Sequence, residues 1–105
     1  MGQPNNIVEE FKQEVRERVK NNALNKPLLE SAQMFMKESI KSKYSYNFSW
    51  MGRPIIQYPQ DIVAMQEIIW KVKPDLVIDV GIAHGGSLIF YASLLEAMGN
   101  GEVLG

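Results

Sequence analysis

The sequence predicts an α/β fold, with N-terminal helices followed by a first strand–helix–strand unit whose two strands are parallel. Three observations support this prediction. Residues 7–40 repeat apolar side chains at helical spacing, residues 76–80 form a short apolar run typical of a buried strand, and a glycine-rich turn then leads into an apolar helix. We therefore expect a helical region over residues 1–43 and an α/β region over residues 44–105.

The composition is that of a globular chain of one-domain size. Its 105 residues are 46% hydrophobic and carry a net charge of −1, which predicts neither wholesale disorder nor a general attraction to nucleic acid. The chain has no cysteine, so it has no disulfide and no thiolate metal site. No apolar run reaches the ~18 residues of a membrane span, and the N-terminus lacks a signal peptide's apolar core. A cytoplasmic protein is expected.

Two amphipathic helices are predicted in the N-terminal region. The first covers residues 7–24, and the second begins with Pro27 in its first turn. The predicted buried stripes consist of Val8, Phe11, Val15 and Val19 in the first helix and of Leu28, Ala32, Phe35, Met36 and Ile40 in the second. The charged faces are expected to be solvated, and binding of a partner by these helices is the alternative.

Residues 41–60 have the composition of a long irregular connection. Aromatic side chains at Tyr44, Tyr46, Phe48, Trp50 and Tyr58 alternate with glycine and proline. Such aromatics either pack onto the domain or wall a ligand pocket, because tyrosine and tryptophan combine an apolar body with a polar group. A short extended piece is expected at residues 55–56.

A third helix is predicted from a cap at Gln60 or Asp61 to about Val72, where Pro74 stops it. Its predicted buried face holds Ile62, Met65, Ile69 and Val72, widened by Ile68. The strand that follows, residues 75–80, is expected to be buried on both faces because it is continuously apolar.

A fourth helix is predicted over residues 87–98, with Ser87 as its cap and glycines at 99 and 101 after its end. It is apolar nearly all round, so it is expected to be well buried. Residues 102–105 open a second strand, parallel to the first. Two parallel strands make a small sheet, so we expect the sequence to be the front part of a larger, here truncated, α/β domain.

The glycine turn after the first strand is the main candidate site. A P-loop would place lysine after the last glycine, and a dinucleotide site would place two glycines one residue apart; neither pattern is present. Asp79 instead lies two residues before Gly81, with Gly85 following, which is the first motif of class I methyltransferases. There a carboxylate anchors the amino group of S-adenosylmethionine. A tight turn without a ligand is the alternative.

A longer stretch resembles the cephalosporin hydroxylase family. The phrases PIIQYPQDIVAMQEIIW at residues 54–70 and VGIAHGGSLIFYASLLE at residues 80–96 are long and unusual, and the resemblance covers residues 44–105. It implies a Rossmann-like, S-adenosylmethionine-dependent methyltransferase fold. Family members are associated with O-methylation of sugars, lipids or antibiotic intermediates, so a small-molecule substrate is expected.

The resemblance also implies which residues bind the cofactor. The cofactor loop would comprise Asp79, Gly81, His84, Gly85, Gly86 and Ser87, and the methionine end would be walled by Gln57, Tyr58 and Gln60. Catalytic residues are not assigned, and magnesium, if used, would be held by carboxylates beyond residue 105. The expected function is therefore the N-terminal part of an O-methyltransferase.

Three further expectations concern single residues and assembly. His84, the one histidine of the chain, is expected to be a hydrogen-bonding loop residue, and Arg53 a surface residue, with binding of a carboxylate or phosphate as its alternative. The rival function is a non-catalytic scaffold that associates with itself. An open strand edge at residues 102–105 would favour a homo-oligomer.

Overall fold

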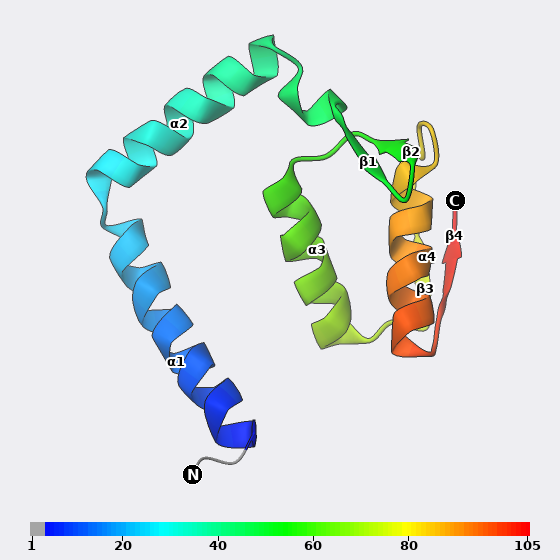
Figure 1. Ribbon diagram of the computed structural model, residues 1–105, viewed down its shortest axis with the longest axis horizontal. Coiled ribbons are helices and arrows are strands. Elements are labelled where there is room, and N and C mark those ends of the chain that lie inside the picture. Colours follow the sequence, from blue (N-terminus) through cyan, green and yellow to red (C-terminus); the bar gives the residue numbers. More distant parts are fainter. Residues whose placement is uncertain (1–3) are drawn as a thin grey trace. The chain divides into compact units, whose positions relative to one another are not determined.

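In the computed structural model, which describes residues 4–105, the chain forms two compact units divided between Glu38 and Ser39 (Figure 1). The first unit holds helix α1 (Pro4–Ala23) and most of helix α2 (Lys26–Lys41). The second unit contains a β-hairpin, two further helices and a pair of parallel strands. An α/β fold is thus confirmed for the second unit.

The two N-terminal helices form as predicted, but their apolar stripes are not buried. α1 begins three residues before the predicted start, and the side-chain oxygen of Asn25 accepts a 3.2 Å hydrogen bond from the Leu28 amide at the start of α2. Phe11 and Val19 of α1 and Ile40 of α2 are exposed. The apolar periodicity predicted the two helices correctly, but the prediction that their apolar stripes are buried was wrong. An apolar stripe is buried only where another element packs against it.

The predicted irregular connection is largely wrong. The chain forms a 3₁₀ turn, η1 (Tyr44–Tyr46), and then an antiparallel hairpin of β1 (Phe48–Trp50) and β2 (Arg53–Ile55), with Ser49 opposite Pro54. Both residues of the tight turn, Met51 and Gly52, have positive φ, at 48° and 83°. Such values suit the right-handed twist of a two-residue hairpin.

Helix α3 (Pro59–Val72) begins differently from the prediction. Tyr58 is its N-cap residue and Pro59 its first residue, while Asp61 lies inside the first turn and donates its amide to the Tyr58 carbonyl at 3.0 Å. Neither Gln60 nor Asp61 is therefore the cap, because Pro59 already has the fixed φ that starts a helix. The helix ends as predicted before Pro74, with Lys73 left-handed; Ile69 is buried, but Val72 is exposed.

Strands β3 (Leu76–Ile78) and β4 (Glu102–Leu104) are parallel, as predicted, with Val77 opposite Val103. Helix α4 (Gly86–Met98) connects them and covers the face that carries this valine pair. Leu76, Ile78 and Leu104 point to the opposite face and are exposed. The expectation of a strand buried on both faces is therefore wrong for the described chain.

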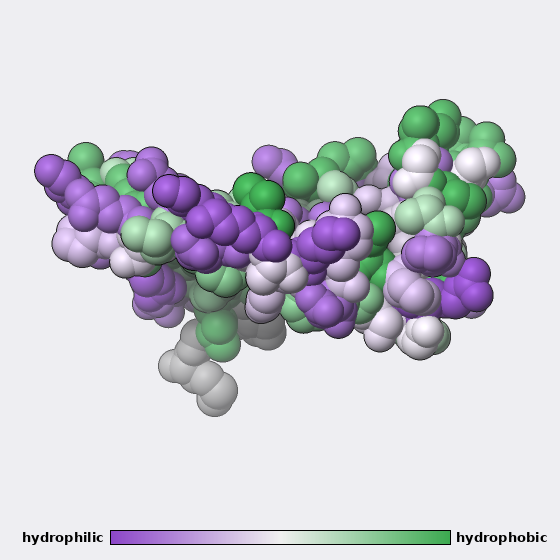
Figure 2. Space-filling view, turned by 90° about the horizontal axis from the view of Figure 1, so that it is seen from above, coloured by the Kyte–Doolittle hydropathy of each residue, from purple (hydrophilic) through white to green (hydrophobic). Residues whose placement is uncertain are grey.

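Figure 2 shows hydrophobic residues gathered at the upper right of the space-filling view. This side corresponds to the right-hand side of Figure 1, where α4 and β4 lie. The core of the second unit lies between the hairpin, α3 and α4. It consists of Ile55, Ile69, Phe90 and Leu95. The core thus joins the hairpin to α4 at the end where the glycine turn lies.

The first residues of α4 correct one further prediction. Gly85, with φ of 86°, is the N-cap residue, so Ser87 lies inside the helix and does not cap it. The other end follows the prediction, because Gly99 is left-handed and its amide donates to the carbonyl of Leu95 at 2.9 Å. Phe90 and Leu95 are buried and Leu88, Ile89, Tyr91 and Leu94 are half-buried, so the helix is partly enclosed.

Candidate functional site

Asp79 lies at the carboxyl end of β3 and is fixed there by two hydrogen bonds. Its amide donates to the Leu104 carbonyl of β4 at 2.8 Å, which extends the parallel pairing by one residue. Its Oδ2 accepts a 2.5 Å hydrogen bond from the hydroxyl of Ser87 in the first turn of α4. The carboxylate is half-buried and points to the side of the sheet that α4 covers. Ligands of open α/β sheets bind at this edge.

The turn from Asp79 into α4 repeats left-handed residues. Gly81, Ala83 and Gly85 have φ values of 77°, 48° and 86°, and the Gly85 amide closes the turn on the Ile82 carbonyl at 2.8 Å. Glycine adopts such values at no steric cost, whereas the alanine is held there by its surroundings. The backbone therefore forms the tight turn that the glycines predict.

Gly86 lacks a side chain because the backbone of β2 lies against it. A Cβ atom at this position would come within 2.1 Å of the Pro54 carbonyl oxygen and 2.8 Å of the Ile55 Cβ. The site-forming turn and the hairpin are therefore in direct backbone contact. This close approach is a reason for glycine at position 86 that does not involve a ligand.

A hollow of about 300 Å³ opens between the hairpin and the glycine turn. Its lining residues are Pro54, Ile55, Ile56, Gly81, Ile82, Ala83, Gly86 and Ser87. The volume is at the lower end of those of small-molecule sites, and the lining is mostly apolar with the Ser87 hydroxyl as a polar group. Sequence reasoning assigned Gly81, Gly86 and Ser87 to the site and missed the wall formed by β2.

Tyr91 is a further residue near Asp79 that the sequence prediction missed. Burial raises the pKa of its phenol above the ordinary value of 10.0, and the negative charge of Asp79 raises it further. The signal was present in the sequence, because Ser87 and Tyr91 are four residues apart on a helix and therefore share a face. Asp79, Ser87 and Tyr91 thus lie on the same side of the site.

The other predicted site residues do not line the hollow; Asp79 and Gly85 are among them, although Asp79 is hydrogen-bonded to the lining residue Ser87. His84 is exposed, and its backbone carbonyl, rather than its imidazole ring, accepts a hydrogen bond from Arg53. The Tyr58 hydroxyl shares a 2.8 Å hydrogen bond with Ser39, and its ring lies 6.0 Å from that of Tyr44. Gln60 is exposed on the first turn of α3, and the Gln57 amide donates to the Ser45 carbonyl. None of these residues lines the hollow beside the glycine turn.

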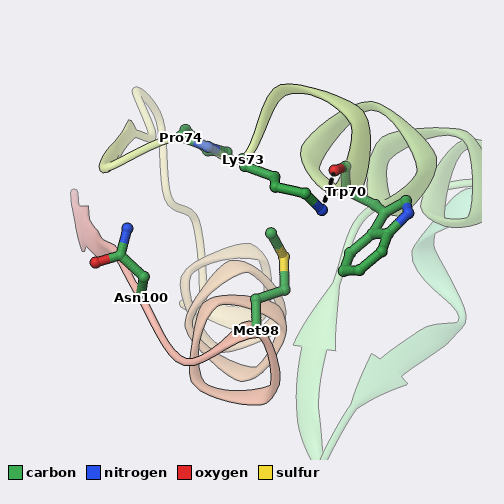
Figure 3. Close-up of a pocket in the computed structure, with 5 residues that line it drawn as sticks. All are labelled: Trp70, Lys73, Pro74, Met98 and Asn100. Carbon is green, nitrogen blue, oxygen red and sulfur yellow. Dashed lines mark hydrogen bonds between the residues drawn. The ribbon is translucent and has the colours of Figure 1, made fainter.

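A second hollow, of about 310 Å³, lies at the other end of the sheet, between the end of α3 and the end of α4 (Figure 3). Its lining residues are Trp70, Lys73, Pro74, Met98 and Asn100. The Lys73 ammonium sits 3.1 Å from the Trp70 ring centroid and donates to the Trp70 carbonyl at 3.0 Å. Its charge is thus already engaged, and the hollow lies at the edge of the sheet where α/β proteins do not bind their ligands.

Within residues 4–105 no three histidine, cysteine, aspartate or glutamate side chains are grouped so that they could hold a metal ion. None of the described helices is both long and apolar enough to cross a membrane.

Comparison with known proteins assigns the chain to a family. Residues 42–105 match the family described as Rhamnosyl O-methyltransferase/CmcI. A rhamnosyl O-methyltransferase of Mycobacterium leprae (strain TN) is 35% identical over 51 residues, which are 49% of this chain and 22% of that relative. The chain thus matches less than a quarter of the length of this curated relative, and no solved structure matches it. The chain belongs to the rhamnosyl O-methyltransferase/CmcI family of cephalosporin hydroxylase-like methyltransferases.

Proposed function

We propose that this chain supplies the first part of an S-adenosylmethionine site in an O-methyltransferase, with Asp79 as the anchor of the cofactor's amino group. The observation that carries the proposal is the position of the Asp79 carboxylate, which follows the first parallel strand and accepts a hydrogen bond from Ser87, a residue that lines the hollow of about 300 Å³. A carboxylate pairs favourably with an ammonium group, and the pairing is stronger when the carboxylate is already oriented.

Each neighbouring residue has a definite part in this proposal. Ser87 orients Asp79 through its hydroxyl, and the turn from Gly81 to Gly86 offers backbone close to the ligand. The wall of Pro54, Ile55 and Ile56 excludes water from one side of the hollow. Gln57, Tyr58, Gln60 and His84 are not needed for this geometry, and their proposed contacts with the cofactor remain predictions from the resemblance.

When bound, S-adenosylmethionine supplies an activated methyl group on a sulfonium centre. The proposed acceptor is an oxygen of a small molecule, sugar or lipid, in keeping with the name of the Mycobacterium leprae relative. The residues described here bind and orient, and no acid, base or magnesium ligand is proposed among them.

Calorimetric titration with two ligands tests the proposal. S-adenosylmethionine carries the amino-acid tail, whereas 5′-methylthioadenosine lacks it. We expect Asp79→Asn to weaken binding of the first about tenfold and to leave binding of the second unchanged, because only the first offers an ammonium group.

Asp75→Asn is the matched control. Asp75 lies just before β3, at the opposite end of the strand, where it accepts a 3.0 Å hydrogen bond from Asn100, a bond that an asparagine oxygen can also accept. This variant should bind both ligands as the wild type does. Absence of S-adenosylmethionine binding by the wild-type chain, or equal binding by the Asp79 variant, would overturn the proposal.

A second candidate function, self-association without methyl transfer, is favoured by the open face of the β3–β4 sheet. Ile78 and Leu104 lie opposite each other on this face, and both are more than half exposed. Apolar surface of this kind is buried when two copies meet. Light scattering on the wild type and on Ile78→Lys tests this: a dimer that the lysine dissociates supports association, and a monomeric wild type contradicts it.

A further inference from the structure

We propose that Arg53 is a positioning residue that fixes the glycine turn in the shape needed for the ligand. The inference rests on the proposed function for its effect on binding, but its effect on the turn can be measured without a ligand. Arg53 opens strand β2 and is 31 residues away from the turn in sequence, so neither the periodicity nor the glycine motif pointed to it.

The contact that carries the inference joins the Arg53 guanidinium to the backbone of the turn. Its Nη2 donates a 2.8 Å hydrogen bond to the carbonyl oxygen of His84. The same nitrogen lies 3.6 Å from the point where a Cβ of Gly85 would stand, so the guanidinium occupies the side of the turn on which a side chain at position 85 would project. A hydrogen bond from a charged donor is stronger than one between neutral groups.

The position of this carbonyl explains why one bond can control the turn. His84 lies between Ala83 and Gly85, both of which have positive φ. The orientation of the 84–85 peptide is set by ψ of His84 and φ of Gly85, so rotation of this peptide would change the left-handed φ of Gly85. The guanidinium opposes that rotation because it holds the oxygen of this peptide.

The hairpin that carries Arg53 is itself anchored on α4 (Figure 1). Ile55 is buried in the core, and the Trp50 indole nitrogen donates a 2.9 Å hydrogen bond to the Ser93 hydroxyl. The Pro54 backbone lies against Gly86 at the start of the same helix. The guanidinium is therefore presented from a fixed platform, as positioning of a binding loop requires.

The experiment compares Arg53→Gln and Arg53→Lys with the wild type by two readouts. The first is the ¹³C chemical shift of the His84 carbonyl together with hydrogen exchange of the Gly85 amide, which is bonded to the Ile82 carbonyl. The second is the affinity for S-adenosylmethionine. Arg18→Gln, which removes an exposed arginine paired with Glu14 on α1, is the matched control.

We expect Arg53→Gln to shift the His84 carbonyl signal, speed exchange at Gly85 and weaken binding about tenfold, while the melting temperature stays that of the wild type. Arg53→Lys keeps a charged donor, so its His84 signal, Gly85 exchange rate and affinity should lie between those of the wild type and of Arg53→Gln. Arg18→Gln should change neither readout. An unchanged His84 signal in Arg53→Gln overturns the inference, as does unchanged affinity when the wild type binds.

The failure of the inference and that of the proposed function are distinguishable. If the wild type does not bind S-adenosylmethionine, the proposed function fails, and the His84 and Gly85 signals alone decide whether Arg53 fixes the turn. If Arg53→Gln unfolds the chain, Arg53→Lys decides instead: wild-type turn signals and affinity in that variant would contradict the need for a guanidinium.

Discussion

The hydroxyl of Ser87 donates a hydrogen bond to the Asp79 carboxylate, across the turn that joins the first parallel strand to its helix. Replacing Ser87 by alanine leaves a half-buried carboxylate without this donor. We expect the unfolding free energy to fall by about 1 kcal/mol, the effect of one hydrogen bond to a partly exposed charge. Urea denaturation measures it. Ser87→Thr, which keeps the hydroxyl, should lose much less, and equal losses in the two variants would contradict this role.

Gly86→Ala should destabilise the chain more than an ordinary glycine substitution. The added Cβ would meet the Pro54 carbonyl oxygen at 2.1 Å, so the hairpin must move away from α4, at a cost of about 2 kcal/mol or more. The fluorescence of Trp50 should change as well, because its indole is hydrogen-bonded to Ser93 of α4.

Gly52→Ala is the control for backbone strain alone. Gly52 also has positive φ but has open space around its Cβ position, so this substitution should cost about 1 kcal/mol. The Trp50 fluorescence of this variant should be that of the wild type. A Gly86→Ala variant as stable as Gly52→Ala would show that the hairpin does not pack against α4 as described.

Tyr91 makes stability depend on alkaline pH. Burial, and then the charge of Asp79, raise the pKa of its phenol above 10.0, so the folded chain holds this proton more tightly than the unfolded chain. The resulting stabilisation is fully present below pH 10.0 and is lost as the pH rises through the folded pKa. Thermal unfolding across this range should show the decline.

Two variants separate the causes of this pKa shift. Tyr91→Phe should abolish the part of the alkaline decline that Tyr91 causes, because no phenol remains at that position. Asp79→Asn should reduce the raised pKa without restoring the ordinary value, since burial is the larger cause. Tyrosinate absorbance, corrected with the Tyr91→Phe titration, reports the pKa directly, and a wild-type value at or below 10.0 would refute the prediction.

Trp50 and Ser93 should be energetically coupled. The indole nitrogen donates to the Ser93 hydroxyl, which in turn donates to the Phe90 carbonyl at 2.7 Å. The Trp50 ring also lies 4.7 Å from the Phe90 ring in an edge-to-face arrangement. In a double-mutant cycle of Trp50→Phe and Ser93→Ala, we expect a coupling of about 1 kcal/mol. Strictly additive losses would show that the bond contributes nothing.

The sequence predicted the four α-helices and the two parallel strands in the right order because the signals involved are local. The apolar spacing of α3, the stop at Pro74 and the glycine after α4 each depend on a few neighbouring residues. The parallel pairing of β3 and β4 followed from the helix between them. The carboxylate at the strand end was predicted in the same way, from Asp79 and the spacing of the glycines.

The errors came from one unusual turn residue and from contacts that the local sequence does not specify. The hairpin was missed because Met51 holds a left-handed position that is usually taken by asparagine or glycine. Ser87 has the chemistry of a cap, yet Gly85 starts the helix and Ser87 faces Asp79 instead. Burial of Leu76 and Ile78 was inferred from their hydrophobicity, which identifies a strand but does not specify what packs on each face.

The amide of Asp79 is tied to the last residue of β4 through the Leu104 carbonyl. The parallel pairing therefore continues to the carboxyl ends of both strands. A ligand that contacts the carboxyl ends of both β3 and β4 binds to strands that are already paired. Binding therefore does not cost the conformational entropy of aligning them.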